Sequence, residues 1–141
     1  MHTGNTLAIV IGLFLTAVLV GQNSAEKFKA EATEAAAAWL NYLDEAMYDE
    51  TWTSSASLVK KAVTHDQWVQ SMESARRMFG DLVERQLKSV NYATTLPGAP
   101  DGHYVVFEYE TEFENKKSAV ETLTVMKDSD GQWRVSGYYI K

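Results

Sequence analysis

Four glutamates in the carboxy-terminal third have the spacing that acid–base chemistry or cation binding would need. Glu108, Glu110 and Glu112 occupy alternate positions, so in a strand they lie on one side, about 7 Å apart. With a hairpin tip at Asn115-Lys116, Glu121 is expected to lie opposite Glu110. Crowded carboxylates can raise one another's pKa or hold a cation. The residues favour the simpler interpretation, a solvated face with lysine and arginine side chains nearby.

The residues between these glutamates predict which side of the sheet is buried. A slip of one residue would carry charge into the core, so the alternation selects one register. The buried side is predicted to hold Val105, Phe107, Tyr109, Thr111, Phe113, Val120, Thr122, Thr124, Met126, Trp133, Val135, Gly137 and Tyr139. The opposite side is predicted to hold Glu108, Glu110, Glu112, Glu121 and Arg134 with Val106, Leu123, Val125, Tyr138 and Ile140.

Helices are expected to come first and to cover the buried side of this sheet. Apolar residues recur at helical spacing over residues 28–46 and 52–63, and a capping box of Thr64 and Gln67 begins a third helix that ends at Gly80. Beyond Gly80 the period becomes two, with strands within 83–95 and at about 104–113, 118–127 and 132–140. The pattern predicts an α+β fold with N-terminal helices on one face of a curved, four-stranded antiparallel sheet.

A cavity between helices and sheet is the candidate ligand site. Its predicted lining contains aromatic and hydroxyl side chains but no carboxylate, histidine or lysine, so general acid–base catalysis is not supported and no catalytic residue is assigned. Such a lining suits core packing or a small apolar ligand. The alternative is a cavity enzyme of isomerase or hydrolase type that uses a carboxylate such as Glu110 or Glu121. The lining residues are Trp39, Tyr109, Thr111, Thr122, Thr124, Trp133 and Tyr139.

The charged side of the sheet also carries apolar residues, which predicts a contact surface. We expect a homodimer formed through this outer sheet face, with the glutamates and Arg134 at its rim. The alternative is that an amino-terminal strand or a loop of the same chain covers the patch. The candidate interface residues are Val106, Leu123, Val125, Tyr138 and Ile140.

Other kinds of chemistry lack support in the sequence. The chain has no cysteine, its three histidines are scattered, and no nucleophile or phosphate-loop motif occurs. Asp128-Ser129-Asp130-Gly131 resembles part of a calcium loop but lacks the other ligands, so it predicts a hairpin turn. No metal or cofactor is therefore expected. A net charge of −6 without a basic cluster argues against nucleic acid and anionic membrane surfaces as partners.

The amino terminus predicts export. Leu7 to Val20 is an unbroken apolar run of 14 residues, which suits a signal-peptide core better than a bilayer span of about 20 residues. Residues 1–25 are therefore expected to be a signal peptide or a short membrane anchor, and residues 26–141 a single α+β domain. The protein would be periplasmic or secreted, or held in the inner membrane by residues 7–20. Membrane contact is expected only through this segment, if it is not cleaved.

Several short motifs occur in an order that resembles a known family. They are Trp39-Leu40, Gln67-Trp68-Val69, Phe79-Gly80, the turn at 96–102 and the ending Gly131-Gln132-Trp133-Arg134-Val135-Ser136-Gly137-Tyr138-Tyr139-Ile140. From about residue 30 to 141 the chain is similar to the bacterial family called domain of unknown function 4019, which consists of small exported proteins. The resemblance implies a cystatin-like or nuclear-transport-factor-like cone and no established activity. We therefore expect a non-enzymatic binding or self-association module.

Overall fold

A computed structural model describes the backbone from residue 8 and the side chains from residue 21. Along the described chain the helices precede the strands. The helices are α1 (Ala8–Asp44), α2 (Tyr48–Thr53), α3 (Ser57–Ala62) and α4 (His65–Phe79). The strands are β1 (Leu82–Ala93), β2 (Tyr104–Phe113), β3 (Lys116–Lys127) and β4 (Trp133–Ile140). The side chains of the predicted export segment, residues 7–20, lie outside the described residues. Among the described residues no helix is long and apolar enough to span a membrane.

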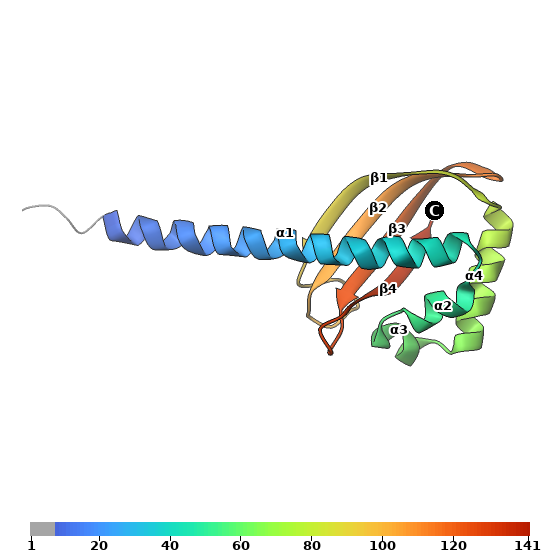
Figure 1. Ribbon diagram of the computed structural model, residues 1–141, viewed down its shortest axis with the longest axis horizontal. Helices are drawn as coiled ribbons and strands as arrows, with labels where there is room; N and C mark the ends of the chain where they lie inside the picture. The colour runs from blue at the N-terminus through green and yellow to red at the C-terminus, as the bar shows by residue number, and fades with distance from the viewer. Residues whose placement is uncertain (1–7) are drawn as a thin grey trace, which may run out of the picture.

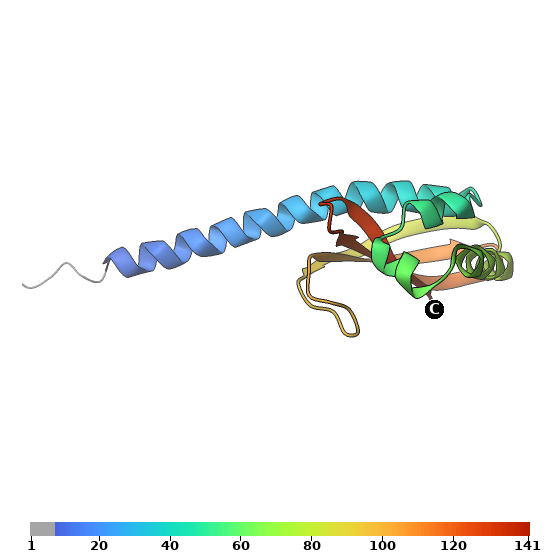
Figure 2. The same ribbon diagram turned by 90° about the horizontal axis from the view of Figure 1, so that it is seen from below.

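The four strands form one antiparallel sheet in the order β1-β2-β3-β4, and α1 lies across one of its faces (Figure 1). The sheet is curved, and α2, α3 and α4 gather at the end where α1 finishes (Figures 1 and 2). The predicted α+β fold with helices on one face of a curved sheet is confirmed. The likeness to a cystatin-like or nuclear-transport-factor-like cone stays a prediction.

The contact between α1 and the sheet is close because small residues line it. Ala32, Ala36, Trp39 and Leu43 follow helical spacing, and each is at most 1 % exposed. The indole Nε1 of Trp39 donates to the backbone oxygen of Thr51 (3.0 Å), which joins α1 to α2. Burying so large a side chain without leaving its N–H unpaired stabilises the whole helical layer.

The start and end of α4 are as predicted. The Thr64 side chain accepts a hydrogen bond from the Gln67 amide, and the Gln67 side chain accepts one from the Thr64 amide, so the capping box is present. Gly80 ends the helix with φ of 77°, and a Cβ there would lie only 3.0 Å from Glu114 and Asn115. A side chain at this position would meet both a strained backbone and a close neighbour.

The predicted register is right for β2 and wrong for β3. Along β2 the side chains of Val105, Phe107, Tyr109, Thr111 and Phe113 are buried, as expected. Along β3 the buried side chains are instead Ala119, Glu121, Leu123 and Val125, so every predicted face assignment in this strand is reversed. Tyr109 pairs with Glu121, and Glu110 pairs with Val120.

A bulge explains this reversal. Phe113 pairs with Lys116, and Thr111 pairs with Ala119. Between these two pairs β2 advances by two residues and β3 by three. One extra residue in a strand turns all following side chains to the other side. Without this bulge, even-numbered residues of β3 would point toward α1 and Glu121 would face solvent.

A second bulge divides β4. Val135 pairs with Val125, but Gly137 pairs with Thr124, so Ser136 is the extra residue. Trp133 and Val135 therefore lie on the buried side, as predicted, while the alternation beyond Ser136 is reversed. Tyr139 turns outward with 62 % of its surface exposed, and Tyr138 turns inward.

Candidate functional site

Glu121 is the side chain that the bulge in β3 brings into the interior. It is 0 % exposed, and both of its oxygens are occupied. Oε1 accepts from Arg85 Nε (2.7 Å) and from the Thr111 hydroxyl (2.5 Å). Oε2 accepts from Arg85 Nη2 (3.1 Å) and from the Tyr138 hydroxyl. The prediction that all acidic side chains of the sheet point away from the helices is therefore wrong for Glu121.

Arg85 joins Glu121 to the end of α1. Its Nη1 and Nη2 donate to the two oxygens of Asp44 at 2.7 and 3.0 Å, a bidentate pair. Asp44 also accepts from Arg76 Nη1 of α4 at 2.9 Å. Consecutive ion pairs thus connect α4, α1, β1 and β3. We call the four residues that form them the charged tetrad: Asp44, Arg76, Arg85 and Glu121.

The tetrad balances its own charge, with two carboxylates and two guanidinium groups. The side chains of Arg76 and Arg85 are only 7 % and 12 % exposed, and Asp44 is 21 % exposed. Arg76 also lies over the ring of Phe113, 4.9 Å from its centre. No buried side-chain nitrogen or oxygen among the described residues lacks a hydrogen-bond partner. This balance matters because a single unpaired charge in such a place would be strongly destabilising.

The tetrad also determines how the neighbouring hydroxyls and the guanidinium titrate. Burial raises the pKa of the Tyr138 hydroxyl far above its usual value, and the charge of Glu121 raises it further. Burial raises the pKa of the Tyr109 hydroxyl to about 12, with Arg85 opposing and Glu121 adding to the change. Burial by itself lowers the pKa of Arg85, but its bonds to Asp44 and Glu121 outweigh that and raise it. At neutral pH both tyrosines are therefore hydrogen-bond donors.

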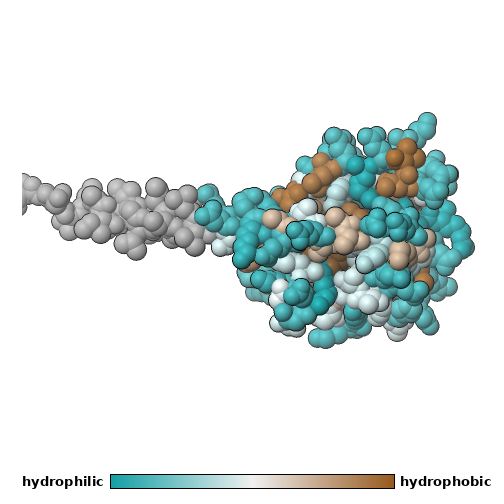
Figure 3. Space-filling view, viewed as in Figure 1, coloured by the Kyte–Doolittle hydropathy of each residue, from teal (hydrophilic) through white to brown (hydrophobic). Residues whose placement is uncertain are grey.

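A groove of about 340 Å³ opens beside the tetrad, between α1 and the β1 edge of the sheet. Figure 3 shows apolar side chains gathered beside α1, over β1. The lining of the groove combines apolar and polar side chains. Its lining residues are Thr33, Ala37, Leu40, Asn41, Asp44, Arg85, Leu87, Phe107 and Tyr109.

Two donors face this groove without a partner. Tyr109 is 9 % exposed and lines the groove, and its hydroxyl makes no hydrogen bond with any described residue. Arg85 has five N–H groups and uses four of them on Asp44 and Glu121, which leaves one on Nη1. Because both groups carry a free O–H or N–H at neutral pH, the groove is suited to a ligand that carries an acceptor.

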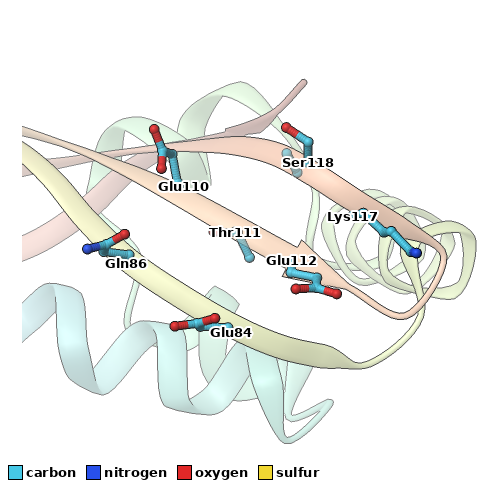
Figure 4. Close-up of a pocket in the computed structure, with 8 residues that line it drawn as sticks. Glu84, Gln86, Glu110, Thr111, Glu112, Lys117 and Ser118 are labelled. Carbon is cyan, nitrogen blue, oxygen red and sulfur yellow. The ribbon is translucent and has the colours of Figure 1, made fainter.

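The glutamate row lies on the outer face of the sheet, as predicted. Glu110 pairs with Lys88 (2.9 Å), and its side chain is 64 % exposed. A cleft of about 200 Å³ lies on this face, and Figure 4 shows Glu84, Glu110, Glu112 and Lys117 around it. The described residues contain no group of three or more side chains that could hold a metal ion. The row is a solvated face, which is the interpretation favoured by the sequence.

The predicted cavity lining is divided between the two faces. Tyr109, Thr111 and Trp133 point from the sheet toward the helices, and Trp39 of α1 points toward the sheet. Trp133 donates from Nε1 to Glu31 (2.8 Å) and packs on Phe28. The other three, Thr122, Thr124 and Tyr139, point outward because of the two bulges. Only Tyr109 lines the groove itself, and its predicted role in binding stays a prediction.

Four of the five predicted interface residues lie on the helix side of the sheet. Leu123 and Val125 are 0 % exposed core residues. Tyr138 packs on Trp39 with ring centres 5.2 Å apart, and Ile140 pairs with Glu121 on the helix side. Val106 alone stays on the outer face. The face assignment of the other four is therefore corrected. The bulge in β3 reverses Leu123 and Val125, and the bulge in β4 reverses Tyr138 and Ile140.

Three members of the tetrad were missed by sequence reasoning. Arg76 lies in the last turn of α4, where the helix dipole alone favours a basic residue. Its position therefore does not indicate a pairing with Asp44. Asp44 follows the buried Leu40 by four residues, so a charge on the buried side of α1 was the available signal. Arg85 has no local signal, because its two partners lie 41 and 36 positions away.

The comparison with protein families identifies the group to which this sequence belongs. The family described as "Protein of unknown function (DUF4019)" matches residues 35–138. The chain belongs to this family. The matched range contains all four residues of the tetrad and most of the groove, so both lie in the part of the chain that DUF4019 describes. No curated protein matches the chain, and no solved structure matches it.

Proposed function

We propose that this DUF4019 protein is a non-enzymatic binding module whose groove takes a small apolar ligand carrying a neutral hydrogen-bond acceptor. The observation that supports this most is Tyr109, which is 9 % exposed and lines the groove, and whose hydroxyl has no hydrogen-bond partner among the described residues. Since this hydroxyl is not a buried unpaired group, it is open to the groove, where a ligand acceptor would replace water as its partner. The apolar side chains of Leu40, Leu87 and Phe107 in the lining would hold the rest of the ligand.

The electrostatics favour a neutral acceptor over an anion. The tetrad already pairs each guanidinium with a carboxylate, so it offers no uncompensated positive charge. An anionic ligand would lie beside Asp44 at the groove wall and be repelled by it. A carbonyl or ether oxygen needs only a donor, which Tyr109 and the remaining N–H of Arg85 supply.

The two carboxylates considered for catalysis are poorly suited to it. A general base must reach a substrate proton within about 3 Å. Glu121 has no exposed surface and accepts four hydrogen bonds from its own chain. Glu110 lies on the opposite face of the sheet from the groove and pairs with Lys88. These placements support binding rather than acid–base chemistry.

We also propose that the protein is exported to the periplasm or beyond, with residues 1–25 as a signal peptide or short anchor. The support is the uncharged, 14-residue apolar run at 7–20, followed by a polar stretch. Because α1 continues from Ala8 to Asp44, cleavage near residue 25 would leave a helix that still spans the groove. The intact mass of the protein recovered from the periplasm tests this.

A matched pair of probes tests the groove. 2-Acetylnaphthalene and 2-isopropenylnaphthalene have nearly the same shape, but only the first carries a carbonyl oxygen. Titration of the full chain, followed by NMR shifts of Ala37 and Leu87, should show tighter binding of the ketone. One hydrogen bond contributes about 0.5–1.5 kcal/mol, so Tyr109→Phe should weaken ketone binding by roughly 2- to 12-fold and leave the hydrocarbon unaffected.

The control is Tyr139→Phe, because that hydroxyl lies on the outer face and is well exposed. It should leave the affinity for both probes unchanged. Equal binding of ketone and hydrocarbon, or equal effects of the two phenylalanine substitutions, would contradict the proposal. So would shifts that avoid Ala37 and Leu87.

A further inference from the structure

The outer face of the sheet carries a strip of neutral side chains along β3, with neutral neighbours on both sides. Outward-pointing residues of β3 are Val120, Thr122, Thr124 and Met126, each partly exposed. Beside them lie Val106 on β2 and Tyr139 on β4, the latter with 62 % of its surface exposed. We call these six residues the neutral strip. The helix α1 lies on the other face, so it does not cover the strip (Figure 2). The loop between β1 and β2 lies on the outer side and covers Tyr104, the β2 neighbour of Met126.

We propose that a second copy of this chain binds the neutral strip, with β3 of each copy stacked on β3 of the other about a two-fold axis parallel to the strands. This goes beyond the groove, which lies on the opposite face. The axis is selected by charge. An axis across the strands would stack the row of Glu108, Glu110 and Glu112 on its own copy, whereas an axis along β3 moves the two rows to opposite rims.

This arrangement makes β2 of one copy face β4 of the other, and the strand pairing within one chain shows which residues meet. Thr124 pairs with both Val106 and Gly137, so Val106 would face Gly137 of the second copy. The side chain of Val106 would then lie opposite Gly137, which has no side chain. Such a match of a projection with a hollow is what a self-complementary interface requires.

The residues that pair with Thr122 and with Val120, farther along β3, are also complementary between the two copies. Thr122 pairs with Glu108 and Tyr139, so the exposed Tyr139 hydroxyl would face the Glu108 carboxylate of the second copy. Val120 pairs with Glu110 and exchanges backbone hydrogen bonds with Lys141, so Glu110 would face Lys141 of the second copy. A donor thus meets an acceptor at one level, and opposite charges meet at the other.

The available area suits a weak, reversible dimer. Only β2, β3 and β4 face strands of the second copy. Strand spacing and rise give about 16 Å² of sheet per residue, so these strands of 10, 12 and 8 residues present roughly 480 Å². Two copies would bury roughly 960 Å², which is the size of a transient interface. Tyr139 supplies the kind of exposed aromatic side chain that is enriched in such interfaces.

Cysteine crosslinking in the full chain tests the geometry directly, because the chain has no cysteine of its own. Thr122→Cys and Thr124→Cys lie near the axis, so a short bis-maleimide should link each to its copy at least ten times more than Ser74→Cys, an exposed position on α4. Equal linking at all three positions would overturn the proposal. So would a Thr122→Cys that resists both linking and maleimide labelling at every dilution, since another segment or partner would then cover the strip.

Substitutions that exchange the side chains at Val106 and Gly137 give a second test. A Cβ at Gly137 would be 3.8 Å from Thr124, an ordinary contact, so Gly137→Val should fold, with an unchanged melting temperature at a concentration where the wild type is monomeric. It should raise the dimer dissociation constant at least tenfold in sedimentation velocity, and adding Val106→Gly should restore most of that loss. A dissociation constant that does not respond to Gly137→Val, or that Val106→Gly only worsens, would refute the stacking of β2 on β4.

Discussion

Replacing Glu121 with glutamine tests the central feature of this structure, a buried acid held by four donors. The change keeps the size of the side chain and removes its charge. The glutamine Oε1 can still accept from Arg85 Nε and Thr111, whereas its amide nitrogen replaces the oxygen that accepts from Arg85 Nη2 and Tyr138. The Tyr138 hydroxyl can rotate and become the acceptor. The Arg85 guanidinium cannot, because it only donates.

The expected loss follows from these contacts. A charge-assisted hydrogen bond contributes about 1.5–3 kcal/mol, and a buried donor without a partner costs about 1–3 kcal/mol more. Glu121→Gln should therefore lower the free energy of unfolding by about 3–5 kcal/mol, which is the range found when one partner of a buried ion pair is removed. Domains of this kind are stable by only about 5–15 kcal/mol, so the loss is a large share of the total.

Urea unfolding of the full chain at pH 7, followed by fluorescence of its four tryptophans, measures this loss. The matched control is Glu110→Gln, which removes a charge from an exposed position on the same sheet and should change stability by less than about 1 kcal/mol. If Glu121→Gln were as mild as Glu110→Gln, Glu121 would not be the buried partner of Arg85. The face assignment of β3 would then be wrong.

Two further predictions concern pH. Hydrogen bonds from Ser57 lower the pKa of Asp128 to about 2 from 3.8, so the stability they add is complete above about pH 4 and is lost as the pH falls through about 2. In urea titrations the free energy of unfolding of the wild type should exceed that of Asp128→Asn by about 2 kcal/mol at pH 5 and equal it near pH 2. A difference that stays constant with pH would contradict this. The pKa of His65 is raised above 6.5 by its hydrogen bond to Asp66 and, less strongly, by Asp49, with burial opposing. Its contribution is present below pH 6.5 and is lost as the pH rises through the folded value. An NMR titration should therefore show a lower midpoint in Asp49→Asn, and an unchanged midpoint would refute the contact.

Much of the fold could be predicted because its signals are local. The capping box of Thr64 and Gln67 involves residues three apart, and the turn at Gly80 depends on one residue's backbone. The alternation along β2 is likewise visible within ten residues. Each of these predictions is confirmed because no distant contact competes with it.

The candidate site could be predicted only in part, for a related reason. Tyr109 lies on the groove because β2 has the predicted register, so its face was correct. The groove itself depends on where α1 crosses the sheet relative to the edge strand β1, and no pattern within either element specifies that. The outward placement of Thr122 and Thr124, against prediction, follows from one extra residue in β3.

The sequence by itself determined the number and order of the strands, the helical layer that covers them and which side of β2 is buried, since periodicity and capping act between near neighbours. Only the tertiary structure decided that Glu121 points inward. A carboxylate in a strand is expected to face water unless a cation compensates it, and that cation, Arg85, is 36 positions away on another strand. The compensation becomes possible only when bulges, sheet pairing and the end of α1 bring the tetrad together.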